Sequence, residues 1–132
     1  MCNLYNICVV DDDVIYQYTT MKIIEILKIS KKQQVFSDGE KALEFIQRHI
    51  NDENELPDIL LLDINMPIMD GFQFMEEYVK FWTQIKKKIN IYIVSSSVDP
   101  LDIEKSKKMI GVSGYVTKPV KLNDIKQIIA EI

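Results

Sequence analysis

The sequence predicts an α/β fold in which a doubly wound, five-stranded parallel sheet, (βα)5, is covered by helices on both faces. Short continuous apolar runs alternate with longer segments whose apolar residues recur every three or four positions, and this alternation occurs five times in 132 residues. Short runs without polar alternation are typical of strands buried on both faces. Regular β-α alternation favours right-handed crossovers in one parallel sheet.

Length and composition indicate one domain over residues 1–132, with no separate output domain. Apolar residues make up 47% and charged residues 27% of the chain, which is typical of a globular domain and not of a disordered one. The net charge of −4 argues against a nucleic-acid partner. No apolar run approaches the ~20 residues of a membrane span and no signal peptide is recognisable, so we expect a cytoplasmic protein without a membrane partner. Cys2 and Cys8 match no disulfide, redox or zinc pattern.

Three apolar runs give the strongest strand signals, at residues 7–10, 59–62 and 91–94, and two weaker signals lie at 34–36 and 114–117. Helical stripes follow each of them. The second helix begins with capping-box spacing between Ser37 and Glu40, the third follows Gly71, and the fourth begins with Asp99 as N-cap and Pro100. The predicted stripes are Val14, Tyr18, Met21, Ile24 and Leu27; Ala42, Leu43, Ile46 and Ile50; Met75, Tyr78, Val79 and Trp82; and, in the last helix, Leu122, Ile125, Ile128, Ile129 and Ile132.

Polar residues stand where the strands end. Individually, these residues are more typical of helix caps and turns than of a functional site. The carboxyl ends of parallel strands share one edge, however, and open α/β sheets bind ligands there. Four such groups, each after a different strand, therefore favour function. The first strand is followed by Asp11, Asp12 and Asp13, the third by Asp63, the fourth by Ser95 and the fifth by Lys118.

Several carboxylates at one edge require compensation, since two of them 4 Å apart repel by ~4 kcal/mol at an effective dielectric constant of about 20. A hard divalent cation such as Mg²⁺, which prefers oxygen ligands, together with Lys118 would cancel the charge of Asp11, Asp12 and Asp63. Converting Asp63 to an acyl phosphate adds charge and oxygens that Mg²⁺, Lys118 and the Ser95 hydroxyl could contact. The pattern thus predicts a carboxylate that accepts a phosphoryl group with metal assistance.

The chain resembles the receiver domains of two-component response regulators over nearly its whole length. Four segments carry the resemblance: residues 9–13 (VVDDD), 62–71 (LDINMPIMDG), 94–96 (VSS) and 114–119 (GYVTKP). The resemblance implies a flavodoxin-like sheet with strand order 2-1-3-4-5. It also implies a phosphoacceptor that catalyses only its own phosphorylation and dephosphorylation, and so is not an enzyme acting on other substrates.

The resemblance further implies residue roles. Asp63 would be the phosphoacceptor and would share in metal binding. Asp12 would bind Mg²⁺ directly, Asp11 would assist, often through water, and the Asn65 backbone carbonyl would complete the ligands. Asp13 is better interpreted as a helix cap or a kinase-facing residue.

Residues from the last two strands would complete this site. Lys118 would pair with the phosphoryl group. The next residue, Pro119, would follow a cis peptide bond. Ser95 would move to bond the phosphoryl group, and Tyr115 would rotate inward behind it. Without the resemblance to the family, Tyr115 would be interpreted as an ordinary half-buried aromatic residue of a strand.

Two alternatives belong to other functional classes. An aspartyl-nucleophile phosphatase of the haloacid-dehalogenase type needs a second aspartate two residues after the nucleophile, where this chain has Asn65. A docking module regulated without phosphate would not need so complete an acidic pocket.

The resemblance implies two kinds of partner. The donor would be a histidine kinase or a histidine-phosphotransfer domain, docking near Val14, Ile15 and Tyr18. An unidentified downstream protein would read the face formed by the fourth and fifth helices, where receivers of this family also form homodimers.

Overall fold

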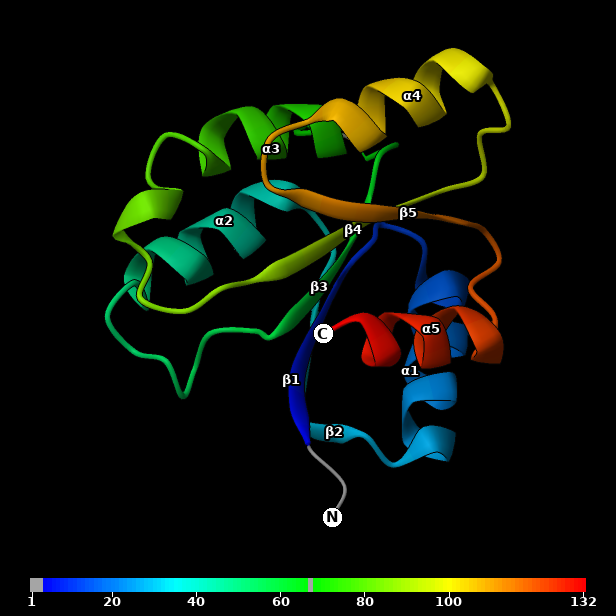
Figure 1. The fold of residues 1–132 in the computed structure, drawn as a ribbon, viewed down its shortest axis with the longest axis horizontal. Coiled ribbons are helices and arrows are strands. Elements are labelled where there is room, and N and C mark those ends of the chain that lie inside the picture. The colour runs from blue at the N-terminus through cyan, green and yellow to red at the C-terminus, as the bar shows by residue number, and fades with distance from the viewer. Residues whose placement is uncertain (1–3, 67) are drawn as a thin grey trace.

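The computed structural model describes residues 4–66 and 68–132. Pro67, within the most specific motif, and Cys2 therefore lie outside the described residues. Five strands alternate with five α-helices (Figure 1). The strands are β1 (Tyr5–Val10), β2 (Ser30–Phe36), β3 (Ile59–Asp63), β4 (Asn90–Ser95) and β5 (Val112–Thr117). The helices are α1 (Val14–Leu27), α2 (Gly39–Arg48), α3 (Gly71–Tyr78), α4 (Pro100–Lys108) and α5 (Leu122–Glu131), with a short 3₁₀ helix, η1 (Trp82–Gln84).

All five strands are parallel and pair in the order β2-β1-β3-β4-β5, which confirms the predicted fold class and strand order. Helices α1 and α5 cover one face of the sheet, and α2, α3 and α4 cover the other (Figure 1). Alternate residues of β1 face the two layers: Cys8 and Val10 pack in the cluster that includes α2 and α3, whereas Ile7 and Val9 pack in the cluster that includes α1 and α5. Among the described helices, none is long and apolar enough to cross a membrane.

Two predicted helix boundaries are wrong. The N-cap of α2 is Asp38, whose carboxylate accepts a hydrogen bond from the Lys41 amide at 2.8 Å, and not Ser37. Helix α3 ends at Tyr78, so Trp82 lies in η1 instead of continuing the α3 stripe. After α3 the chain turns more tightly, because backbone hydrogen bonds join residues three apart, such as the bond from the Phe81 amide to Tyr78 O. This turn buries Phe81 against the Tyr78 ring.

The stripe predicted for α1 is correct only in the second half of the helix. Ile24 is fully buried, but Val14 is 72% and Tyr18 63% exposed. Near the start of α1 the inward side instead carries Tyr16, which is half-buried, and Thr20, which is buried. Because the polar Thr20 occupies an inward position there, the pattern of apolar residues does not predict which side of this part of the helix is buried.

Candidate functional site

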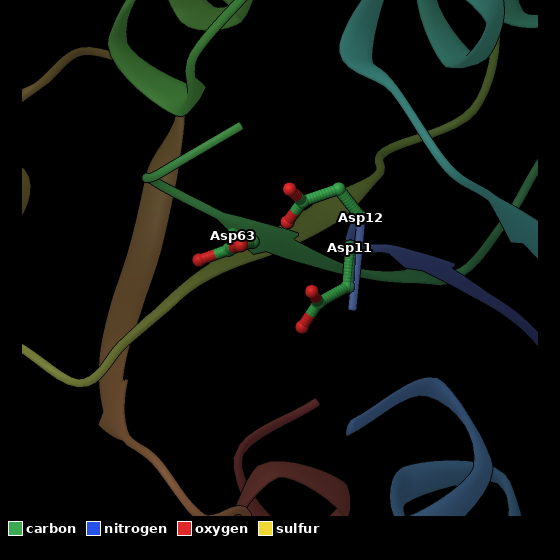
Figure 2. Close-up of side chains that lie close together, drawn as sticks. All are labelled: Asp11, Asp12 and Asp63. Carbon is green, nitrogen blue, oxygen red and sulfur yellow. The ribbon is translucent and has the colours of Figure 1, made fainter. Parts of the chain in front are cut away.

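The acidic site lies at the carboxyl edge of the sheet. Asp63 is the last residue of β3, while Asp11 and Asp12 come directly after β1. Strand pairing aligns these ends, since Val10 is the register partner of Leu62. Figure 2 shows the three aspartate side chains emerging close together from the ends of the two strands. The convergence predicted from strand order alone therefore occurs for these residues.

The three aspartates form a candidate metal site. Each offers one carboxylate oxygen, and these oxygens all lie within 4.8 Å of one another. Asp11 and Asp63 are buried, at 5% and 3% exposure, and Asp12 is exposed. An all-oxygen set with an open side is the donor chemistry that Mg²⁺ prefers, because this ion keeps several waters or phosphate oxygens in its octahedral shell. The residues present fit the ion that the sequence predicts.

Lys118 supplies the positive charge within the site. Its Nζ atom lies 2.9 Å from Asp11 Oδ2 and 3.3 Å from Asp63 Oδ1, and its side chain is almost fully buried. Burial alone would lower the pKa of Lys118, but its hydrogen bonds and attraction to the carboxylates of Asp11 and Asp63 outweigh that effect and raise the pKa. One ammonium against three carboxylates leaves an excess of negative charge, which a divalent cation would cancel.

The environment of Asp63 disfavours its charged form. Burial is the largest cause, and the neighbouring Asp11 carboxylate adds to it, so that the pKa of Asp63 rises from 3.8 to about 6. Lys118 and the Asn65 amide, which donates to Asp63 Oδ1 at 3.3 Å, oppose this rise without reversing it. A positive charge placed beside a carboxylate in this environment stabilises its ionised form.

Local backbone features hold the acidic residues in place. A Cβ atom on Gly71 would lie 2.7 Å from Asp63 O and 2.9 Å from Ile64 Cα, so only glycine permits α3 to begin this close to β3. Asp13 caps α1 by accepting hydrogen bonds from the amides of Ile15 and Tyr16, and its own amide donates to Asp11 Oδ1 at 2.9 Å. The cap interpretation of Asp13 is confirmed.

The side chains of Ser95 and Tyr115 are both hydrogen-bonded to the Ser97 backbone, and the backbone oxygen of Ser95 accepts a hydrogen bond from the Lys118 amide at 2.8 Å. Ser95 is fully buried at the end of β4, and its Oγ accepts a hydrogen bond from the Ser97 amide at 3.0 Å. The half-buried Tyr115 donates its hydroxyl to Ser97 O at 2.9 Å. The Lys118–Pro119 peptide bond is cis, as the resemblance implies.

Two α1 residues at the site were missed from the sequence. The Tyr16 ring lies under Lys118, with Nζ 4.2 Å from the ring centroid, and Gln17 Nε2 donates to the backbone oxygen of Asp11. The available signal was the spacing of four that links Tyr16, Thr20 and the buried Ile24. A search for apolar stripes chose Val14 and Tyr18 instead.

Asn65 is exposed beside Asp63. It donates its backbone amide to the Asp63 carboxylate and presents no carboxyl group of its own. The second acid that a haloacid-dehalogenase-type phosphatase needs is therefore missing from that position.

The family of response regulator receiver domains matches residues 7–130. The chain belongs to this family. A solved two-component response regulator from Cytophaga hutchinsonii has a TM-score of 0.88 and 25% sequence identity, over 98% of this chain and 96% of that chain. The structure thus contains a receiver domain of two-component signalling with an acidic pocket at Asp11, Asp12 and Asp63.

Curated relatives of this receiver place the domain in different contexts. It is 24% identical to the probable methanogenesis regulatory protein FilR2 of Methanothrix harundinacea, over 96% of this chain and 79% of that protein. It is 29% identical to the two-component response regulator ARR12 of Arabidopsis thaliana, over 90% of this chain but 18% of that protein. The receiver thus corresponds to most of the first relative and to a small part of the second.

Proposed function

We propose that this receiver accepts a phosphoryl group on Asp63 from the phosphohistidine of a histidine kinase or a histidine-phosphotransfer domain. The observation that carries the proposal is the position of the Asp63 carboxylate. It belongs both to the acidic triad, with oxygens within 4.8 Å, and to the surroundings of the buried Lys118 ammonium, 3.3 Å away. A nucleophile between a metal site and a fixed cation is the arrangement that transfer of a charged phosphoryl group needs.

The transfer balances as one substitution at phosphorus. An Asp63 carboxylate oxygen attacks the phosphorus atom and forms the new P–O bond, while the P–N bond to the donor imidazole breaks. The electron pair of that bond stays on the imidazole nitrogen, which takes a proton from solvent. Lys118 pairs with the phosphoryl oxygens and offsets their growing negative charge. Asp11, Asp12, Asp63 and the Asn65 backbone carbonyl would hold Mg²⁺, which would supply positive charge to offset that of the phosphoryl group.

The change in charge at Asp63 would be read by Ser95 and Tyr115. The Ser95 hydroxyl would turn from the Ser97 amide toward the phosphoryl group, and Tyr115 would release Ser97 O and rotate inward. Both contacts are single hydrogen bonds of about 3 Å, each of which contributes only about 1 kcal/mol. A phosphoryl group can therefore shift the equilibrium between the two arrangements.

Exposed apolar side chains support docking as the means of input and output. Val14, Ile15 and Tyr18 stand 72%, 74% and 63% exposed on α1 beside the site, where a donor domain must approach. Val98, 79% exposed and directly after Ser97, and Leu101, 74% exposed in the first turn of α4, would meet the downstream protein. Clustered apolar exposure of this kind marks interaction sites.

Incubation with phosphoramidate and Mg²⁺, followed by intact mass measurement, tests the proposal. We expect the mass of one added phosphoryl group, no addition in excess EDTA, and none for Asp63→Asn. Asp58→Asn, at the opposite end of β3, is the matched control and should be phosphorylated normally. Absence of uptake by the folded wild type, or undiminished uptake by Asp63→Asn, would refute the assignment.

A further inference from the structure

We propose that the aromatic ring of Tyr16 positions Lys118 for phosphoryl transfer. This inference rests on the proposed function, and it assigns a role to a residue of α1 that belongs to none of the four segments carrying the family resemblance. Tyr16 does not touch the reacting atoms. It acts through the lysine, whose ammonium lies 4.2 Å from the centre of its ring.

Lys118 is held between two unlike surfaces. On one side its Nζ atom reaches Asp11 Oδ2 at 2.9 Å and Asp63 Oδ1 at 3.3 Å. The Tyr16 ring contacts the same ammonium, and the lysine side chain is only 7% exposed. An ammonium group within about 6 Å of an aromatic ring centre is attracted to the ring face, more strongly when water is excluded. The ring therefore stabilises the charged lysine where it is buried.

The ring holds the ammonium without accepting a conventional hydrogen bond from it. A lysine has three N–H donors, and the two neighbouring carboxylates account for two. Among the described residues no further oxygen is paired with this ammonium, so its third N–H, which has only the Tyr16 ring beside it, can turn to a phosphoryl oxygen. Lys87 provides the contrast within the same chain, because its Nζ contacts Asp58 at 3.0 Å and also donates to the backbone oxygens of Glu53 and Leu56. Lys87 thus has three oxygen acceptors, whereas Lys118 has two in the part of the chain that the structure describes.

The position of Tyr16 is itself fixed by the start of α1. The Asp13 carboxylate accepts hydrogen bonds from the amides of Ile15 and Tyr16, at 2.8 and 3.3 Å. Gln17 Nε2 donates to the backbone oxygen of Asp11 and lies 3.4 Å from Ser37 Oγ, so the first turn of the helix is attached to the ends of β1 and β2. The ring is thus placed by the backbone segment that carries the acidic residues.

Two substitutions separate the ring from the hydroxyl group. Tyr16→Phe keeps the ring and should phosphorylate from phosphoramidate and Mg²⁺ within about twofold of the wild-type rate. Tyr16→Leu keeps apolar bulk without a ring and should be slower by roughly 3- to 30-fold, the range expected for losing one cation–π contact. Tyr16→Met serves as a second ring-free variant, and thermal unfolding establishes that each protein is folded.

A double-mutant cycle distinguishes positioning from a general structural effect. In a Lys118→Met background, Tyr16→Leu should slow uptake no further, because the group on which the ring acts is gone. Equal slowing in both backgrounds, or a wild-type rate for folded Tyr16→Leu and Tyr16→Met, would overturn the inference while leaving Asp63 as acceptor intact.

A spectroscopic measurement reads the contact without requiring phosphorylation. The Lys118 ε-methylene protons should show a ring-current shift in the NMR spectrum that Tyr16→Phe keeps and Tyr16→Leu loses. Absence of that shift in the wild type would also overturn the inference. If the shift is present but the wild type takes up no phosphoryl group, the proposed function fails and the positioning role for transfer fails with it.

Discussion

The two ends of the central strand β3 each carry an aspartate–lysine pair, and the pairs differ in how their charges are matched. At the amino end, Lys87 lies 3.0 Å from Asp58, whose other carboxylate oxygen accepts a hydrogen bond from the Asn6 amide at 2.7 Å. At the carboxyl end, Lys118 faces Asp11 and Asp63 together, and Asp12 lies within reach of the same metal-binding position. The first pair is balanced, whereas the second has excess negative charge.

This difference shows that an ion pair alone does not identify a functional site. The amino-end pair joins chain segments, since Lys87 also binds two backbone oxygens and the Asn90 side chain donates to Asp58 O. Asn6 Oδ1 is the only buried side-chain polar atom there without a partner among the described residues. The carboxyl end retains charge that a cation and a phosphoryl group can use.

Replacing each lysine by methionine should give the largest contrast between the two ends. Lys118→Met removes the ammonium that offsets the incoming phosphoryl charge, and we expect uptake from phosphoramidate to slow about 100-fold, typical of losing one preorganised electrostatic group. Lys87→Met should leave the uptake rate unchanged and lower the free energy of unfolding by about 1–3 kcal/mol, because Asp58 and two backbone oxygens lose their partner. Rates by intact mass and urea unfolding measure the two effects. Similar slowing in both variants would remove the functional distinction between the pairs.

Docking of the phosphoryl donor should also depend on which end of the sheet carries the substitution. Ile15→Asp introduces a charge into the exposed apolar side chains of α1, and we expect at least a roughly tenfold slower transfer from a phosphorylated histidine-phosphotransfer domain, equivalent to about 1.4 kcal/mol. Its uptake from phosphoramidate should not change. Leu4→Asp is the matched control, because Leu4 is 52% exposed next to the amino end of β1. Equal loss in both variants would exclude α1 as the docking surface.

The aspartates of the two pairs should affect stability with opposite signs. Asp63 has a folded-state pKa of about 6 against an ordinary 3.8, so its contribution to stability is full below pH 3.8 and is lost as the pH rises to about 6. In metal-free buffer at pH 7, Asp63→Asn should therefore unfold with a free energy about 1–2 kcal/mol higher than the wild type.

The same experiment supplies a control at the other end of β3. The Asp63→Asn advantage should grow between pH 4 and pH 6 and then level off. Asp58→Asn should lower stability at pH 7 by about 1 kcal/mol, since it weakens the ion pair with Lys87. Urea unfolding across this pH range measures both variants, and a destabilising Asp63→Asn substitution would contradict the charge-excess account.

Magnesium should also have a small effect on stability, and only through the carboxyl end of β3. A ligand that binds the folded state at ten times its dissociation constant stabilises by about 1.4 kcal/mol. We expect Mg²⁺ to raise the unfolding temperature of the wild type and of Asp58→Asn, and to have little effect on Asp12→Asn. A similar rise for Asp12→Asn would show that the triad is not the metal site.

The sheet and most of the site could be predicted because both follow from local patterns. The apolar runs at 7–10, 59–62 and 91–94 identify the central residues of the buried strands β1, β3 and β4, and parallel order then brings Asp11, Asp63 and Lys118 to one edge. Fine boundaries could not be predicted, since Ser37 and Asp38 are both good caps and only the folded turn selects Asp38. Tyr16 was not predicted because its partner is the charged Lys118, which directly follows β5, and not the apolar core.

The most direct test of the central claim locates the phosphoryl group itself. Protein phosphorylated with phosphoramidate and Mg²⁺ is reduced with borohydride, which converts an aspartyl phosphate to homoserine, and the modified residue is identified by peptide fragmentation. We predict homoserine at position 63, at the charge-excess end of β3, and unmodified aspartate at position 58. Homoserine at position 58, 11 or 12 instead of 63 would contradict the account.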